Sequence, residues 1–347
     1  MNNTSLIDLS KNENSFGPNP HVVTALMNIV EKISLYPCMS GHKLKEILGE
    51  FHNIQPEQIV IGNGSVSILD HCARAILSPG DEAIIPRSTF IAIPQIVRDH
   101  GAHVIDIPLS NWVIDLQRCL SLIGPRTRLI ILVNPNNPTG TCLPQETIIN
   151  FLQHVPPHIN VVVDEAYIDY IQDPSAASVA DLINEFDNLS VTRTFSKAHG
   201  LAALRIGYSI MPQPVAKRIN AFQLPFSNNS LALEAAALSI QDSDYLKRVR
   251  IHNKSGQEQL CSAFREMGIN YIDSVANFIS IKLGADTKMV FDYLKARRIL
   301  VAPQASVNMP DYLRVTIGAE EQNSIFLNYM REYIISSTEG IPAYEAV

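Results

Sequence analysis

The sequence predicts an α/β protein with a mostly parallel sheet sandwiched by helices in a large domain, beside a smaller α+β domain. Three observations predict this. Short, almost wholly apolar runs, such as residues 129–133 and 159–163, have the length of strands that are buried on both faces. Segments with helical spacing of apolar residues alternate with such runs from about residue 59 to residue 210. After residue 230 the pattern changes to a long helical stretch, followed by mixed strands and helices.

The first stretch of the chain, to about residue 20, is polar and contains Gly17, Pro18 and Pro20. We therefore expect it to form an extended arm. Apolar residues then recur at helical spacing in residues 21–33 and 43–51. These two segments predict helices that precede the first strand of the sheet.

Strands and helices alternate through the middle of the chain. Strands are expected at residues 59–61, 83–85, 103–107, 129–133, 159–163, 189–194 and 205–210, and helices at residues 65–77 and 90–100. Because such sheets bind ligands beyond the carboxyl ends of their strands, the residues that follow each strand are the first candidates for a site.

The last third of the chain has a different pattern. Residues 230–267 indicate helix without a strand, and strands expected at 269–272, 278–283 and near 313–317 alternate with helices at 287–297 and from 320. A length of 347 residues favours one large and one smaller domain. We expect an N-terminal arm with part of the small domain at residues 1–27, the large domain at 28–250 and the rest of the small domain at 251–347.

The composition disfavours several kinds of partner. The net charge is −7 and Lys and Arg form no long run, which argues against nucleic acid and anionic membranes. The N-terminus lacks the basic and apolar regions of a signal peptide, and the apolar runs are too short to span a bilayer. The five cysteines are scattered without a CxxC pair, which is typical of reduced thiols in the cytoplasm, and no metal site is expected.

Three of the expected strands end in unusual residues. NPNNPTG at 134–140 follows one strand, DEAY at 164–167 follows the next, and TFSK at 194–197 ends a third, with Arg205 eight residues further on. Taken singly, these are an Asx-Pro turn, a capping or paired carboxylate and a solvated Ser-Lys pair. Because the carboxyl ends of parallel strands meet at one edge of a sheet, the combination predicts a single chemical site.

These segments closely resemble the signature segments of class I/II aminotransferases, which are pyridoxal-phosphate (PLP) enzymes of fold type I. The closest resemblance is to the histidinol-phosphate aminotransferase-like group. Its opening segment is present as LSKNENSFGP at 9–18, its YP segment as Tyr36-Pro37, and its late segment as LRVTIG at 313–318. The resemblance extends from about residue 9 to about residue 326. It implies the cofactor and the fold far more specifically than it implies a substrate.

The resemblance implies a chemical role for the residues that follow the strands. Lys197 would form the Schiff base with PLP and later carry a proton between the substrate and the cofactor. Asp164 would face the pyridine nitrogen and keep it protonated, so that the ring accepts electrons. Tyr167 and Asn137 would donate hydrogen bonds to the ring hydroxyl oxygen, and Asn137 is also expected beside the substrate.

The phosphate group of PLP needs N–H donors and a cation. The tripeptide Gly64-Ser65-Val66 lies between an expected strand and an expected helix, where backbone amides favour an anion. Further donors are expected from Thr194, Ser196 and Arg205. The segment GNGSVS lacks the third glycine of a dinucleotide fingerprint, so a nicotinamide site is disfavoured.

Four further residues are assigned by resemblance, three of them against an ordinary alternative. Phe90 would stack on the face of the cofactor ring, or else be a core residue of its helix. Tyr36 would reach the cofactor phosphate of a neighbouring subunit, which implies a homodimer with shared active sites. Arg314 would bind the substrate carboxylate with two hydrogen bonds, or else form a surface ion pair. Phe16 would flank the substrate, or else serve only in packing.

The chain departs from the resembling group at positions that select the substrate. Histidinol-phosphate enzymes usually place an Arg that helps to bind the substrate phosphate where this chain has Ala302. Val66 and Ser67 replace two acidic residues, and Ile93 replaces a Tyr. His199 stands where an aromatic residue is usual, and it would shape the pocket, titrate near neutral pH or act only as a spacer.

We therefore expect an aminotransferase that moves an amino group between an amino acid, or an amino-alcohol phosphate, and a 2-oxo acid. The departures keep open a PLP-dependent decarboxylase, or an eliminating or cyclising enzyme of specialised amino-acid metabolism. A non-catalytic PLP-binding regulator is the remote alternative, and the acidic net charge disfavours the DNA-binding domain that such regulators carry.

Overall fold

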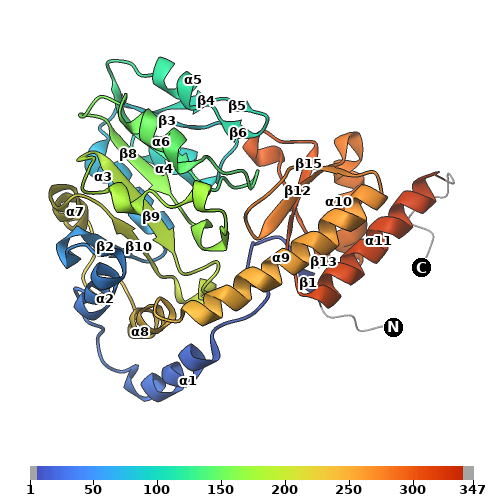
Figure 1. Ribbon diagram of the computed structural model, residues 1–347, viewed down its shortest axis with the longest axis horizontal. Helices are drawn as coiled ribbons and strands as arrows, with labels where there is room; N and C mark the ends of the chain where they lie inside the picture. The colour runs from blue at the N-terminus through green and yellow to red at the C-terminus, as the bar shows by residue number, and fades with distance from the viewer. Residues whose placement is uncertain (1–5, 339–347) are drawn as a thin grey trace.

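The computed structural model describes residues 6–338 and shows two bodies joined by a long helix (Figure 1). The larger body, at the left of the view, contains a seven-stranded sheet, and the smaller one, at the right, contains a four-stranded sheet. The outer ends of the expected arm and of the expected C-terminal region, residues 1–5 and 339–347, lie outside the described residues.

The large sheet has the strand order β2 (Ile59–Gly62), β10 (Gly207–Ile210), β9 (Leu189–Thr194), β8 (Asn160–Asp164), β7 (Thr127–Val133), β3 (Glu82–Pro86) and β4 (His103–Ile107). Neighbours from β9 to β4 are parallel, whereas β10 is antiparallel to both β2 and β9. The expected α/β class with a mostly parallel sheet is confirmed.

Helices cover both faces of this sheet because its strands are apolar on both sides. In β7, Leu129 and Ile131 pack into one core, whereas Ile130 and Leu132 pack into the other, as the alternation of side chains along a strand requires. The first core is closed by α3 (Ser65–Ile76), α4 (Ala92–Asp99) and α7 (Gln213–Asn220). The second is closed by α1 (Pro20–Ile29), α2 (His42–His52), α5 (Leu116–Ser121), α6 (Gln145–Leu152) and α8 (Ser230–Ser239).

The smaller body is built on an antiparallel sheet of β11 (Asn270–Tyr271), β12 (Phe278–Lys282), β15 (Tyr312–Thr316) and β14 (Ala302–Pro303). Helices α10 (Thr287–Ala296) and α11 (Glu320–Thr338) pack on it. The N-terminal arm joins this body, because β1 (Ile7–Asp8) pairs in parallel with β13 (Ile299–Leu300) and Leu9 is buried in its core.

Helix α9 (Ser243–Glu266) belongs to both bodies (Figure 1). Its first turns contribute Tyr245 and Val249 to a cluster with Tyr167, and its last turns contribute Leu260 and Phe264 to the core of the small body. The expected domain boundary at 250/251 falls inside this continuous helix and stays a prediction.

Several short elements lack a signal in the sequence. They include the hairpin of β5 (Leu109–Ser110) and β6 (Val113–Ile114), the helices α5, α6 and α7, and the two-residue strands β1, β13 and β14. The helical stretch at 230–267 is divided into α8 and α9, because the side chain of Asp242 accepts a hydrogen bond from the backbone N–H of Tyr245 and caps α9. The expected strand at 205–210 begins later, at Gly207, since Arg205 is in the left-handed conformation with φ of 56°.

Candidate active site

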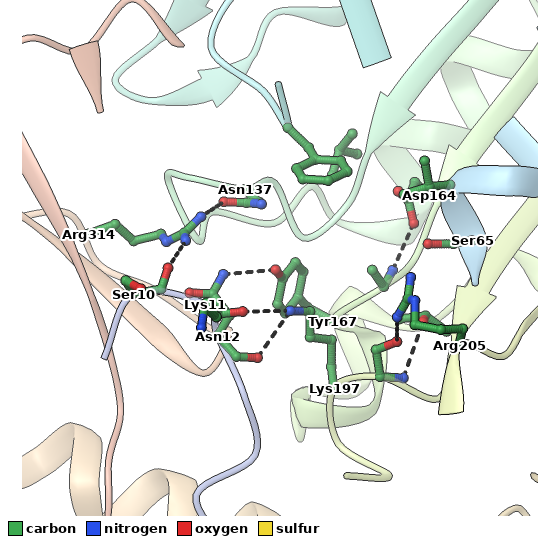
Figure 2. Close-up of a pocket in the computed structure, with 16 residues that line it drawn as sticks. Ser10, Lys11, Asn12, Ser65, Asn137, Asp164, Tyr167, Lys197, Arg205 and Arg314 are labelled. Atoms are coloured by element: carbon green, nitrogen blue, oxygen red, sulfur yellow. Dashed lines mark hydrogen bonds between the residues drawn. The ribbon is translucent and has the colours of Figure 1, made fainter. Parts of the chain in front are cut away.

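A pocket of about 340 Å³ lies at the carboxyl ends of β7, β8 and β9, where the arm and β15 of the small body close over the large sheet (Figure 2). Most of the residues expected from the sequence line it: Ser65, Val66, Phe90, Asn137, Asp164, Tyr167, Thr194, Ser196, Lys197, Arg205 and Arg314. Residues separated by about 250 positions in the chain are thus brought into one cavity.

The segment after β7 is held in place by its own side chains. Asn136 is buried, its amide N–H donates to the backbone oxygen of Ser88 at 2.9 Å, and its amide oxygen accepts from the hydroxyl of Thr89 at 3.1 Å. The peptide bonds Asn134–Pro135 and Asn137–Pro138 are both cis. This fixed turn places Asn137 in the wall of the pocket.

Asp164 is the last residue of β8 and is buried. One of its carboxylate oxygens accepts a hydrogen bond from the backbone N–H of Ala166 at 3.1 Å. Burial raises the pKa of the carboxyl group from 3.8 to about 7, against the smaller lowering effects of the Ala166 N–H and the Lys197 amine. A carboxyl group in such surroundings favours a positively charged or N–H-bearing partner.

Tyr167 lies three residues beyond Asp164, and its hydroxyl accepts a hydrogen bond from the amide of Asn12 at 2.9 Å. Lys197 follows β9, and its amine donates to the backbone oxygens of Lys11 and Asn12 at 3.0 and 3.1 Å. The same amine lies 5.7 Å from the centre of the Tyr167 ring. The arm therefore touches both side chains, and the amine of Lys197 lies inside the pocket (Figure 2).

One end of the pocket is built for an anion. Helix α3 begins at Ser65 without a side-chain cap, so its first backbone N–H groups are open to a ligand. Gly64 has φ of +83°, and a Cβ atom there would lie 2.7 Å from Nη2 of Arg205. The guanidinium of Arg205 donates to the Ser196 hydroxyl at 3.3 Å. Glycine at position 64 thus allows the Arg205 cation to lie directly against the start of α3.

The opposite end of the pocket holds a second cation, Arg314 of β15. Figure 2 shows Arg314 and Arg205 at opposite ends, with Tyr167 and Lys197 between them. The two terminal nitrogens of Arg314 donate to the side-chain oxygen of Asn137 and to the backbone oxygen of Ser10, each at 2.6 Å. Its Nε is buried without a partner, and burial lowers the pKa of the guanidinium. Arg314 is therefore a partly unsatisfied cation aimed into the cavity.

Three of the expected residues do not line this pocket. Gly64 precedes the start of α3 and lies against the guanidinium of Arg205, which itself lines the pocket. Tyr36 is 83% exposed and its ring packs on that of Phe226, with ring centres 4.8 Å apart. Phe16 contacts the rings of Tyr245 and His252, with centres 5.9 and 5.5 Å apart, so its contacts are those of a packing residue.

The pocket also contains residues that sequence reasoning did not assign: Ser10, Lys11, Asn12, Val133 and Ala166. Val133 precedes the recognised NPNNPTG motif, and Ala166 lies within the recognised DEAY motif. The other three belong to the LSKNEN segment, which was matched by resemblance but had no role. The pairing of β1 with β13, together with hydrogen bonds of Leu9 and Asn12 to Thr316, brings that segment back over the pocket.

The residues present fit PLP. Its phosphate group suits the start of α3 with Ser196 and Arg205, its protonated ring nitrogen suits the buried carboxyl group of Asp164, and its aldehyde suits the amine of Lys197. The cradle left by Gly64, which a Cβ atom would fill, supports the same fit. When bound, PLP accepts the amino group of a substrate and takes up the electrons released at the substrate carbon.

The fold and this arrangement of charges define an enzyme that works through pyridoxal phosphate. The sequence profile of the aminotransferase class I and II family matches residues 4–329, and the chain belongs to that family. It is a PLP-dependent aminotransferase.

Known relatives agree with this membership. Histidinol-phosphate aminotransferase 2 of Pseudomonas fluorescens strain Pf0-1 is 40% identical over 330 residues, which cover 95% of this chain and 89% of the relative. The enzyme of the same description from Nitrosospira multiformis is 36% identical and covers 99% of this chain and 87% of its own length.

Solved structures show the same fold. Histidinol-phosphate aminotransferase of Sinorhizobium meliloti in complex with pyridoxal-5'-phosphate superposes with a TM-score of 0.91 at 25% identity, covering 96% of this chain and 91% of that one. Aspartate aminotransferase of Thermus thermophilus, with maleate, has a TM-score of 0.85 at 22% identity and covers 94% of this chain and 91% of its own. The expected PLP fold type I is confirmed. Within residues 6–338, no helix is both long and apolar enough to cross a bilayer.

Proposed function

We propose that this aminotransferase exchanges an amino group between a phosphorylated amino alcohol of the histidinol-phosphate type and a 2-oxo acid. The observation that carries the proposal is Arg314, a half-buried cation with a buried, unpaired Nε at the end of the pocket opposite Arg205. A single guanidinium there binds either the phosphate of the amino alcohol or the carboxylate of the oxo acid, one after the other. The names of the relatives support the same substrate.

Ala302 limits how strongly a substrate phosphate is held. It lies directly opposite Arg314 in the pairing of β14 with β15, so its methyl group shares a face of the sheet with the guanidinium. A methyl group adds no charge beside Arg314. The proposal therefore includes a preference for phosphate over carboxylate that is weaker than a pair of cations would provide.

Within this reaction we assign the other residues as follows. Lys197 holds the cofactor covalently and, once a substrate amine has displaced it, carries the proton between the substrate carbon and the cofactor carbon. Asp164 keeps the ring nitrogen protonated. Tyr167 and Asn137 hold the ring hydroxyl oxygen, and the ring of Phe90 covers one face of the cofactor.

The phosphate of the cofactor is assigned to the backbone N–H groups at the start of α3. Ser65 and Val66 lie in its first turn, and Gly64 leaves room for the Arg205 cation. The hydroxyl groups of Thr194 and Ser196 line the same end of the pocket. A doubly charged anion in this position gains both from the helix dipole and from the guanidinium.

We further propose a homodimer in which Tyr36 reaches the active site of the partner. Large apolar side chains are exposed along α1 and the segment that follows it, and Tyr36 also contacts the exposed Phe226: the others are Met27, Val30, Ile33, Leu35 and Met39. Exposed apolar groups of this extent are typical of protein interfaces. Sedimentation equilibrium of the PLP-loaded enzyme should give twice the mass of one chain, whereas a single-chain mass would exclude the shared site.

The five free cysteines support a reducing compartment, and we propose the cytoplasm. Fractionation of cells of the source organism should place the protein there.

The substrate is tested with the PLP-loaded enzyme, 2-oxoglutarate as amino acceptor, and histidinol phosphate or unphosphorylated histidinol as donor. We expect glutamate to form from the phosphorylated donor with a kcat/KM at least about tenfold higher than from histidinol, which corresponds to about 1.4 kcal/mol. Arg314→Gln should lower kcat/KM for both the phosphorylated donor and 2-oxoglutarate by about 100-fold, since it loses charge-assisted hydrogen bonds worth about 3 kcal/mol. Lys282→Gln, an exposed charge on the same small sheet, is the matched control and should behave as wild type.

Three outcomes would contradict the proposal. Equal use of both donors would show that the phosphate is not recognised. An Arg314→Gln variant with the kinetics of Lys282→Gln would show that Arg314 does not bind the substrate anion. Release of carbon dioxide, or of a dehydrated or cyclic product detected by mass spectrometry, would favour the alternative PLP reactions.

A further inference from the structure

We infer that His199 is a positioning residue, which fixes the loop of Lys197 against helix α8 and against the loop that carries Tyr167. The inference rests on the proposed role of Lys197 as the residue that bonds to PLP. His199 itself does not line the pocket, and it acts through the backbone of residues 195–201. Its surroundings differ from those of an ordinary core aromatic residue, because both of its ring nitrogens face polar groups.

The ring of His199 is only 2% exposed and is held from three sides. Its Nδ1 lies 2.8 Å from the hydroxyl oxygen of Ser239 on α8, and its Nε2 lies 3.5 Å from a carboxylate oxygen of Asp169. Its ring centre lies 4.8 Å from that of Phe195. A carboxylate only accepts, so Nε2 carries the proton that faces Asp169, and in the neutral ring Nδ1 accepts from the Ser239 hydroxyl. The ring therefore has one preferred orientation.

The carboxyl group of Asp169 stays ionised in this arrangement. Burial alone would raise its pKa, but the contact with His199 and the nearby cations Arg193 and Arg250 lower that pKa to about 2. The backbone oxygen of Asp169 also accepts from Nε of Arg250 at 2.6 Å, which ties it to α9. Asp169 lies two residues beyond Tyr167, in the segment that follows β8, and His199 lies in the segment that follows β9. The contact between His199 and Asp169 therefore connects these two segments.

The loop that carries Lys197 is short and closed, so a fixed His199 also fixes Lys197. The N–H of Gly200 donates to the backbone oxygen of Lys197 at 2.9 Å, and the N–H of Leu201 donates to that of Phe195 at 3.0 Å. On the other side, the amide of Asn14 donates to the backbone oxygen of Ala198 at 2.8 Å. A side chain that must move a proton between two carbon atoms is sensitive to displacements of about 1 Å, which cost up to about 100-fold in rate.

The test compares variants that keep the ring volume with variants that keep the polar contacts, all fully loaded with PLP. His199→Phe retains the contact with Phe195 and loses both polar contacts. His199→Gln places an N–H near the position of Nε2 and retains the contact with Asp169. His100→Phe is the matched control, because His100, the C-cap of α4, makes a similar contact with Asp70 of α3, at 2.9 Å, away from the pocket.

We expect His199→Phe to lower kcat by about tenfold while KM for the amino donor changes by less than about twofold. His199→Gln should recover part of the loss, and His100→Phe should leave kcat unchanged even if Tm falls. A His199→Phe enzyme with wild-type kcat and only a lower Tm, or an equal loss of kcat in His100→Phe, would overturn the inference.

Two further variants keep the test decisive if His199→Phe does not fold. Ser239→Ala and Asp169→Asn each weaken one contact of the His199 ring, and each should lower kcat without a matching change in KM. Wild-type kcat in both would overturn the inference. Failure of the proposed role of Lys197 is recognised separately, because Lys197→Ala would then still bind PLP covalently, whatever the His199 variants show.

Discussion

Replacing Asp164 with Asn tests whether the site without bound PLP destabilises the Asp164 carboxylate, which a positively charged partner would then stabilise. Burial raises the pKa of Asp164 from 3.8 to about 7, so in the protein without PLP the ionised form is destabilised. Asn has nearly the same shape and no charge. The substitution therefore removes the unfavourable ionisation and leaves the packing at the end of β8 almost unchanged.

The sign and size of the effect follow from the two pKa values. As pH rises, the unfolded chain releases the Asp164 proton first, so the free energy of unfolding falls between about pH 4 and about pH 7. The stabilisation is complete below this window and lost above it. A rise from 3.8 to about 7 corresponds to roughly 4 kcal/mol, at about 1.4 kcal/mol for each pKa unit. Above pH 7, Asp164→Asn should be more stable than the wild type by up to about 4 kcal/mol.

Urea unfolding of both proteins, stripped of PLP, measures this difference at about pH 4 and about pH 8. With PLP restored, the same variant should lose at least about 100-fold in kcat, because an amide does not keep the ring nitrogen protonated. Identical pH dependence of unfolding in the two proteins would refute the claim that burial destabilises the carboxylate. Full activity of Asp164→Asn would refute its assignment to the ring nitrogen.

Two further predictions concern the backbone and the charges around the site. Gly64→Ala should weaken PLP binding about tenfold in a fluorescence titration, because a Cβ atom is strained at φ of +83° and contacts the Arg205 guanidinium. Gly80→Ala, at φ of +90° with open space around it, should bind PLP normally. Equal affinities of the two variants for PLP would contradict this prediction. Arg193→Met should lower the free energy of unfolding by about 3–5 kcal/mol because the buried Glu165, 3.0 Å away, loses its cation and keeps only neutral hydrogen-bond donors. Removing the exposed Lys43, which pairs with Glu234, should lower the free energy of unfolding by less than about 1 kcal/mol. A loss equal to that of Arg193→Met would show that burial of the ion pair is unimportant.

The sequence alone was sufficient to predict the large sheet and the residues at the centre of the site. Apolar runs of strand length, such as 129–133, predict buried strands, and the carboxyl ends of parallel strands meet at one edge. Asp164, Tyr167 and Lys197 therefore had to lie close together. Their positions along the chain, at the ends of two neighbouring strands, carry this information without any knowledge of the tertiary structure.

Contacts between distant short segments were beyond sequence reasoning. Strands β1 and β13 have two residues each, about 290 positions apart, and neither has a detectable period. Without that pairing nothing indicates that Asn12 bonds to Tyr167 or that Ser10 bonds to Arg314.

The antiparallel direction of β10 goes with the structure of its connection and not with its composition. Its apolar sequence resembles that of its parallel neighbours, yet the twelve residues between β9 and β10 contain no α-helix that could cross over the sheet. The role of His199 could not be predicted from the sequence, because its partners Ser239 and Asp169 lie 40 and 30 positions away and no sequence motif connects them.

The most direct test of the central claim is to locate the covalent bond between the protein and PLP. Reduction of the PLP-loaded enzyme with borohydride, followed by digestion and mass spectrometry, identifies the lysine that carries the cofactor. We expect one modified position, Lys197, and no stable adduct in Lys197→Ala. A cofactor bonded to a different lysine of the pocket, such as Lys11, or an adduct that survives in Lys197→Ala, would contradict the account.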